Sequence, residues 1–145
     1  MNNFPEDQKI WVPWMRRAIQ LALLAEGKTS PNPLVGSIVL DSGGRLVGEG
    51  FHTGAGNPHA EIEALSQAGK KSANGTIVVT LEPCCHHGLT PPCTEAIIKA
   101  GLKRVVVGMV DPDPRVSGNG ILRLKDSGLE VIEGVLSQEC ELINR

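Results

Sequence analysis

Residues 76–110, TIVVTLEPCCHHGLTPPCTEAIIKAGLKRVVVGMV, predict a strand, a helix and another strand in that order. The strands are expected at 76–81 and 105–110, where apolar residues form two short β-branched runs. The helix is expected at 93–100, after two prolines that fit the first turn of a helix because their missing N–H group costs nothing there. Strands that alternate with helices indicate an α/β domain whose later strands run parallel.

The chain before this unit predicts two more helices and a hairpin. Helical periodicity extends over residues 7–26. Short strands at 35–40 and 45–51, joined by a glycine-rich turn, predict the hairpin. The next helix is expected at 59–68, with Pro58 at its entrance.

The chain after this unit predicts a strand at 129–132 and a short terminal helix at 137–144, whereas the glycines of 117–120 predict a loop. The whole pattern favours a three-layer α/β/α sandwich around a central mixed sheet. A length of 145 residues suits one domain of ordinary size. We therefore expect residues 1–145 to form a single α/β domain.

The composition argues against several classes of partner. The formal net charge is -2 and no long basic run is present, so a nucleic-acid-binding surface is not indicated. Two Phe, two Trp and no Tyr leave few rings on which single-stranded nucleic acid could stack. The sequence shows neither a bilayer-spanning apolar stretch nor a secretory signal. We therefore expect a cytoplasmic protein with reduced cysteines and without a nucleic-acid or membrane partner.

Three short motifs together predict a metal site. They are His59-Ala60-Glu61 at a predicted helix start, Pro83-Cys84 after a buried strand, and Pro92-Cys93 at the next helix start. One imidazole and two thiolates form a ligand set typical of catalytic zinc, in which the fourth position stays open for water. The sequence therefore predicts Zn²⁺ held by His59, Cys84 and Cys93.

Glu61 is the predicted proton carrier of this site. It follows His59 by two residues, which is close enough to reach a water on the metal without ligating the metal itself. A carboxylate there can take a proton from the attacking water and pass it to a ring nitrogen and then to a leaving amine. Both predicted helices direct their positive ends at the site, which favours thiolate over thiol.

The spacing of these motifs is close to that of the zinc deaminases. Those enzymes carry His-x-Glu followed by Pro-Cys-x-x-Cys. The first half of the signature is present, but eight residues, not two, separate Cys84 from Cys93. A two-residue gap is typical of the nucleoside and tRNA deaminases, so the longer gap favours a different family of zinc deaminases.

The stretch LEPCCHHGLTPPC at residues 81–93 resembles the deaminase domain of the bacterial riboflavin-biosynthesis deaminase/reductase, a member of the cytidine-deaminase-like superfamily. Residues 30–36 (SPNPLVG), 59–61 (HAE) and 110–120 (VDPDPRVSGNG) resemble it too, and the motifs occur in the family order. The resemblance implies the three-layer fold of that superfamily. It also implies hydrolytic deamination, with release of ammonia, of a diaminopyrimidinone that carries a phosphoribosylamino group.

The resemblance further implies that the three predicted ligands hold zinc, that Glu61 shuttles protons, and that Asn32, His52 and Asp111 bind the substrate. Asn32 and His52 would lie against it, and Asp111 near its ribose. From the residues alone other roles stay open. Asn32 lies between two prolines and is also explained as a turn residue, and Asp111 is also explained as the cap of a turn.

Three positions depart from the family pattern. Leu89 stands where the family usually has Arg or Lys facing the substrate phosphate, Asp113 where Asn is common, and Cys85 where Ser or Asn is common. The first two changes remove a positive charge and add a negative one, so we expect phosphate recognition weaker by about 1–3 kcal/mol. Cys85 is expected to be a packed thiol, whereas His86 and His87 fit either a substrate contact or a solvated loop.

Other functions are compatible with the same residues. One is a zinc deaminase of another small heterocycle, of the guanine or cytosine type. Another is a non-catalytic zinc-binding interaction module, which would need a fourth protein ligand such as Cys85 or His86. A thiol redox protein is disfavoured because the chain has no C-x-x-C motif.

The family protein normally continues into a reductase domain that uses a nicotinamide cofactor. Nothing in residues 1–145 is expected to form that domain, so we expect a single zinc-dependent deaminase domain with a small pyrimidine as its partner. Family members associate, which makes a homo-oligomer an open expectation. Trp11 and Trp14 near the N-terminus would serve such an interface or pack in the core.

Overall fold

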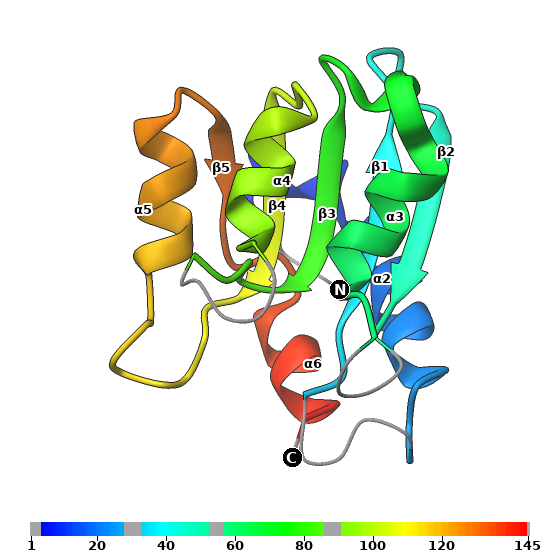
Figure 1. Cartoon of the computed structure of the whole chain (residues 1–145). Coiled ribbons are helices and arrows are strands. Elements are labelled where there is room, and N and C mark those ends of the chain that lie inside the picture. The colour runs from blue at the N-terminus through cyan, green and yellow to red at the C-terminus, as the bar shows by residue number, and fades with distance from the viewer. Residues whose placement is uncertain (1–3, 28–32, 53–56, 86–90, 145) are drawn as a thin grey trace.

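The structure is a computed structural model that describes residues 4–27, 33–52, 57–85 and 91–144. Within these residues, five strands form one sheet (Figure 1). The strands are β1 (Gly36–Leu40), β2 (Leu46–Phe51), β3 (Thr76–Leu81), β4 (Arg104–Met109) and β5 (Glu130–Ile132). The helices are α1 (Glu6–Lys9), α2 (Val12–Leu23), α3 (Ala60–Ala68), α4 (Cys93–Lys99), α5 (Asn119–Asp126) and α6 (Ser137–Leu142), with the 3₁₀-helix η1 (Gly69–Ser72) after α3.

The sheet is mixed, with the strand order β2-β1-β3-β4-β5. β1 pairs antiparallel with both β2 and β3, and β4 pairs parallel with both β3 and β5. Parallel neighbours need a crossover connection, and α4 and α5 provide the two crossovers. The hairpin and the parallel later half that the sequence predicts are therefore confirmed.

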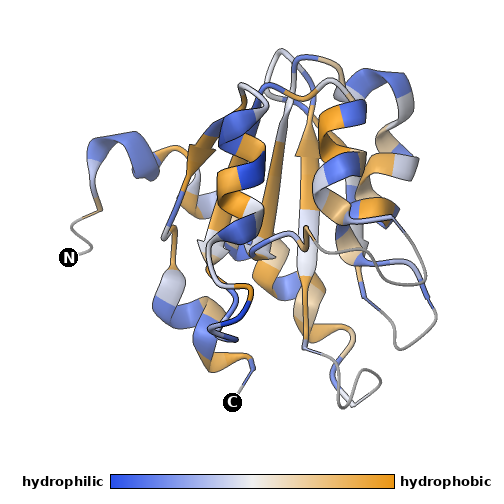
Figure 2. Ribbon diagram, turned by 60° about the vertical axis from the view of Figure 1, so that its left-hand side comes forward, coloured by the Kyte–Doolittle hydropathy of each residue, from blue (hydrophilic) through white to orange (hydrophobic). Residues whose placement is uncertain are grey.

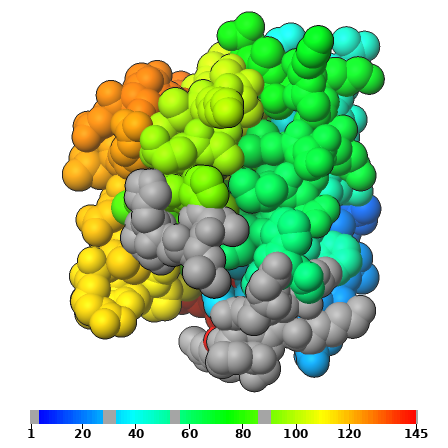
Figure 3. Space-filling view, in the orientation of Figure 1, coloured from blue at the N-terminus to red at the C-terminus, as the bar shows by residue number. Residues whose placement is uncertain are grey.

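Helices cover both faces of the sheet. α3, α4 and α5 pack on one face, which is the face seen in Figure 3, and α2 and α6 pack on the other. Ile77 and Val79 of β3 belong to the core under the first set of helices, and Val78 belongs to the core under the second. Because both faces are covered, β3 and β4 are apolar almost throughout (Figure 2). The predicted α/β/α sandwich is confirmed.

The helix expected at residues 7–26 is instead two helices, α1 and α2. Proline is tolerated only in the first turn of a helix, and Pro13 accordingly lies in the first turn of α2, so that a new helix begins at Val12. Trp11, between the two helices, is buried in the core, and Trp14 packs against the same cluster. No helix in the described part of the chain has the length and apolar character needed to cross a membrane.

The prediction of a loop at residues 117–120 is wrong for its second half, because α5 begins at Asn119. Gly118 precedes the helix with a φ of 83°, which glycine adopts without strain. Gly120 lies so close to the chain before α4 that a Cβ atom there would be 2.0 Å from the carbonyl oxygen of Pro83. The glycines therefore let α5 approach Pro83-Cys84. The other predicted elements agree with the structure to within two residues.

Candidate active site

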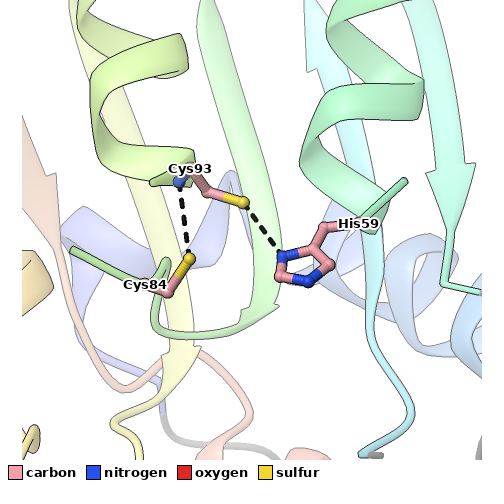
Figure 4. A group of neighbouring side chains, drawn as sticks. All are labelled: His59, Cys84 and Cys93. Atoms are coloured by element: carbon pink, nitrogen blue, oxygen red, sulfur yellow. Dashed lines mark hydrogen bonds between the residues drawn. The ribbon is translucent and has the colours of Figure 1, made fainter. Parts of the chain in front are cut away.

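The three predicted zinc ligands meet near the carboxyl end of β3 (Figure 4). His59 is the N-cap residue of α3, Cys93 is the first residue of α4, and Cys84 follows β3. Their donor atoms all lie within 4.8 Å of one another. Nδ1 of His59 is 3.3 Å from Sγ of Cys93. Residues from three elements therefore form one compact donor group.

The N-terminus of α4 holds Cys84 in place. The backbone N–H of Cys93 donates a hydrogen bond to Sγ of Cys84 at 3.4 Å. The next backbone N–H, that of Thr94, donates to the carbonyl oxygen of Cys84 at 3.1 Å. These amides belong to the first turn of a helix, whose N–H groups have no acceptor within the helix itself. The first turn of α4 therefore fixes both the backbone and the sulfur of Cys84.

The chemistry of the donor group fits zinc. The pairing with Cys93 lowers the pKa of Cys84 to about 4, and the same pairing, together with burial, raises the pKa of Cys93. The two thiols thus compete for one negative charge, whereas a dication between them would stabilise both as thiolates. Cys84 in turn raises the pKa of His59. Within the described part of the chain, no fourth His, Cys, Asp or Glu joins the group, and Cys85 is outside it.

Glu61 lies in the first turn of α3, two residues from His59, and is 4% exposed. This burial raises the pKa of Glu61 to about 7. A carboxyl group with such a pKa can both accept and donate a proton near neutral pH. Glu61 also lines the same small cavity as His59 and Cys84. The sequence-based expectation that it lies beside the metal ligands without being one agrees with this geometry.

The cavity beside the donor group has a volume of about 200 Å³. Two of the predicted substrate residues, His52 and Asp111, line it. The buried His52 ring stands edge-on to the His59 ring with 5.0 Å between their centroids, and its Nδ1 lies 3.3 Å from the carbonyl oxygen of Pro58. Pro33 lines the cavity as well. The third predicted contact, Asn32, lies outside the described residues.

Three further residues discussed from the sequence, His86, His87 and Leu89, lie outside the described residues. Cys85, by contrast, is described and is partly buried, and burial raises the pKa of its thiol. Its sulfur is not part of the donor group of His59, Cys84 and Cys93.

Asp113 forms an exposed ion pair within its own loop. The guanidinium group of Arg115 donates to both carboxylate oxygens of Asp113, with Nη2 2.8 Å from Oδ2. This interaction lowers the pKa of Asp113 to about 2. The ion pair keeps Asp113 ionised, so the departure at position 113 still adds one negative charge to this exposed loop.

Among the cavity residues that were not predicted from the sequence, Glu82 is the one with an ionisable side chain. Glu82 lies between β3 and Pro83, lines the cavity and is 5% exposed. Its carboxylate accepts hydrogen bonds from backbone amides of a distant loop and of α5. The only signal in the sequence is an acidic residue at the end of an otherwise apolar strand, and such a residue is rarely buried without a partner.

Comparison with known proteins gives three findings. The matching family model describes the cytidine and deoxycytidylate deaminase zinc-binding region and covers residues 10–109. A riboflavin biosynthesis protein RibD from Synechocystis is 56% identical over 130 residues, which are 90% of this chain and 35% of that protein. A diaminohydroxyphosphoribosylamino-pyrimidine deaminase from Buchnera aphidicola is 52% identical over 132 residues, which are 91% of this chain and 89% of that protein.

A solved structure of RibD from Acinetobacter baumannii, form 2, superposes on the chain with a TM-score of 0.92 and 46% sequence identity. The superposition covers 96% of this chain and 39% of that one. The chain therefore spans a minor part of the RibD relatives but most of the Buchnera deaminase. The cytidine-deaminase-like fold and the resemblance to the riboflavin-biosynthesis deaminase are both confirmed.

Proposed function

Because the chain belongs to the cytidine and deoxycytidylate deaminase family, we propose that it hydrolytically deaminates a riboflavin precursor. The precursor is a diaminopyrimidinone that carries a phosphoribosylamino group, and its exocyclic amine leaves as ammonia. The observation that carries the proposal is the 52% identity to a diaminohydroxyphosphoribosylamino-pyrimidine deaminase of which the chain covers 89%. That relative is matched over nearly its whole length, and the 132 matched residues of this chain are enough to extend over both the cavity and the proposed metal ligands.

His59, Cys84 and Cys93 would hold the zinc ion of this family. When bound, zinc would lower the pKa of a water molecule, so that the water could lose a proton near neutral pH and act as a nucleophile. Glu61 would accept one proton of the attacking water and pass it to a ring nitrogen, and would then carry the second proton from the new hydroxyl group to the leaving amine. The carbon that loses its amine gains the oxygen of the water, so the products are a ring carbonyl and ammonia.

His52, Asp111 and Asn32 are the proposed substrate contacts. Support for the first two is their position in the lining of the cavity that also contains Glu61. The backbone N–H of Asp113 donates to Oδ1 of Asp111 at 2.9 Å, and this bond orients the carboxylate. In the proposed complex Asp111 accepts a hydrogen bond from a ribose hydroxyl. Asn32 is proposed from the sequence alone.

The proposal extends to the setting of the reaction. Residues 1–145 would act as one catalytic unit on a small-molecule pyrimidine in the cytoplasm, and the protein would associate as a homo-oligomer. The burial of Trp11 in the core makes that side chain unavailable as an interface anchor.

One sequence feature favours a second candidate, a deaminase of another small heterocycle of the guanine or cytosine type. Leu89 occupies a position at which the family usually has a basic residue that faces the substrate phosphate. Ammonia release from a panel that contains the phosphorylated precursor, guanine and cytidine distinguishes the two candidates. A higher kcat/KM for guanine or cytidine would favour the second.

The decisive experiment is to measure zinc content and ammonia release for wild type and Glu61→Gln. We expect both proteins to bind zinc equally and the variant to lose about 10²–10⁴-fold in kcat, because it cannot carry the proton. Glu63→Gln is the matched control, since Glu63 lies on the same helix but is exposed. Equal activity of wild type and Glu61→Gln would exclude the proposed mechanism. Bound zinc with no activity on any amine would favour a non-catalytic zinc module.

A further inference from the structure

Glu82 makes an unusual set of hydrogen bonds for a buried carboxylate. Its Oε1 accepts from the backbone N–H groups of Asp111 and Gly118, each at 3.0 Å. Its Oε2 accepts from the backbone N–H of Ile121, also at 3.0 Å. All three donors are main-chain amides, which belong to a different part of the chain from Glu82 itself. Hydrogen bonds of this kind to a charged acceptor are among the strong ones in proteins.

The three amides bracket the loop that connects β4 to α5. Asp111 is at the start of that loop, Gly118 at its end and Ile121 in the first turn of α5. The loop carries Asp111 to the cavity, where its proposed role is to bind the ribose. Because one carboxylate holds both ends of the loop, Glu82 fixes the position of Asp111 relative to α5.

Glu82 is also tied to the metal site. Its own backbone N–H donates to the carbonyl oxygen of Met109 at 2.8 Å, so it continues the pairing of β3 with β4. Only Pro83 separates it from Cys84, and α4 holds Cys84. One residue therefore connects the segment that carries a zinc ligand with the loop that carries a proposed substrate contact.

A simple helix cap would explain only part of this arrangement. α5 has no side-chain cap of its own, and the bonds of Glu82 to Gly118 and Ile121 fill that role. The bond to Asp111 is different, because this amide is at the opposite end of the loop and its residue lines the cavity. Capping does not require that third bond.

We infer that Glu82 is a positioning residue for the substrate, which acts by holding Asp111 in place beside the metal ligands. This inference rests on the proposed deamination, because the substrate contact of Asp111 is part of that proposal. Glu82 makes no contact with the reacting atoms in this scheme. Its loss should therefore affect binding of the substrate more than the chemical step.

The variant Glu82→Gln isolates this role. A glutamine side chain has nearly the same shape, but one acceptor oxygen is replaced by an NH₂ donor. In either orientation of the amide, its NH₂ group would face at least one of the backbone N–H groups that now donate to Glu82, and two donors cannot form a hydrogen bond with each other. The loop should shift while the fold around it stays intact. Glu133→Gln is the control. The Glu133 carboxylate is partly exposed, lies 3.1 Å from Nζ of Lys125, and does not line the cavity.

The test measures zinc content, kcat, KM for the phosphorylated diaminopyrimidinone, and amide hydrogen exchange at positions 111, 118 and 121. For Glu82→Gln we expect unchanged zinc, a KM about tenfold or more above wild type, a kcat within about threefold of it, and faster exchange at all three amides. Glu133→Gln should match wild type. Loss of zinc, or an unchanged KM with three protected amides, would overturn the inference.

A double-mutant cycle separates positioning from general stability. In the Asp111→Ala background, Glu82→Gln should raise KM little further, because its effect acts through Asp111. Additive effects of the two substitutions on KM would contradict the inference. If Glu82→Gln does not accumulate as folded protein, Glu82→Asp replaces it in the cycle, since this shorter carboxylate keeps the charge but cannot span all three amides. Wild-type protein that is inactive on the substrate would refute the proposed function instead, and exchange at the Asp111 amide would then still decide whether Glu82 holds the loop.

Discussion

Cys140 is a thiol for which the proposed chemistry has no use. Its side chain is fully buried between α6 and β4, and a Cβ atom added at Gly108 would lie 2.3 Å from its Sγ. This burial, with a smaller contribution from Glu139, raises the pKa of Cys140 to about 12. The folded protein therefore keeps a proton in a pH range in which the unfolded chain releases it.

We predict that the free energy of unfolding falls as the pH rises from about 9 to about 12, because the unfolded chain then binds fewer protons than the folded one. Below this range the thiol is protonated in both the folded and the unfolded state, and its contribution to the free energy of unfolding is at its maximum. A single group gives a slope of up to about 1.4 kcal/mol per pH unit. Denaturant unfolding of wild type and Cys140→Ala at successive pH values measures it. The stability difference between the two proteins should narrow above pH 9, and parallel curves would contradict the prediction.

Single residues differ in how far the sequence predicts them. The donor group of His59, Cys84 and Cys93 was predictable because the motifs typical of a metal site depend on residue type and local spacing, both of which the sequence displays. Glu82 was not, because its three partners are 29, 36 and 39 residues further along the chain and are backbone amides. Every residue except proline carries such an amide, so residue identity gives no signal.

At the scale of elements, α5 is placed by a close approach between backbones. A Cβ atom on Gly120 would lie 2.0 Å from the carbonyl oxygen of Pro83 and 3.2 Å from Cγ of Glu82. A real side chain at this position would push α5 away from the segment that carries Cys84. The glycine therefore sets the distance between this helix and the metal site.

We predict that Gly120→Ala destabilises the protein by about 1–3 kcal/mol, because backbone must move to admit the methyl group. Helix propensity alone predicts the opposite sign, a gain of about 1 kcal/mol. Gly43→Ala is the matched control, since a Cβ atom there would meet its nearest neighbour, Oδ1 of Asp41, at an ordinary 3.5 Å. Thermal unfolding of both variants measures the effect. A Gly120→Ala variant as stable as wild type would show that the approach of α5 is not tight.

Glycines obscured one element, α5, although its sequence is strongly amphipathic. β3 matches its predicted bounds because its run of apolar and β-branched residues is continuous and both of its faces are buried. α5 was missed because the glycines at 118 and 120 indicate a loop, and they are present for reasons of packing and φ angle instead. The buried pair Ile121 and Leu124, three residues apart on an amphipathic segment, was a helical signal. A stronger indication of a helix at this position was that the parallel strands β4 and β5 need a crossover connection.

For the whole molecule, the layered architecture followed from the sequence, and the assembly of the site followed from the architecture. Strands alternating with helices predicted a parallel later half, and the carboxyl ends of such strands are where α/β proteins collect ligands. His59, Cys84 and Cys93 nevertheless come from three separate segments. That they meet within 4.8 Å depends on the antiparallel pairing of β1 with β3, which brings α3 next to α4.

Because the ligands belong to three segments, zinc should stabilise the entire fold and not only the site. A ligand that binds only the folded state adds about 4 kcal/mol when its free concentration is a thousand times its dissociation constant. We predict that removal of zinc with a chelator lowers Tm by roughly 10 °C, since 1 kcal/mol corresponds to about 2–4 °C in a domain of this size or slightly larger. Calorimetry with and without chelator, together with zinc analysis, measures the shift. Glu61→Gln should show the same shift as wild type and His59→Ala a much smaller one, because only the latter loses a ligand. An unchanged Tm after complete removal of zinc would mean that the apo fold already holds the three segments together, and that the metal serves the reaction alone.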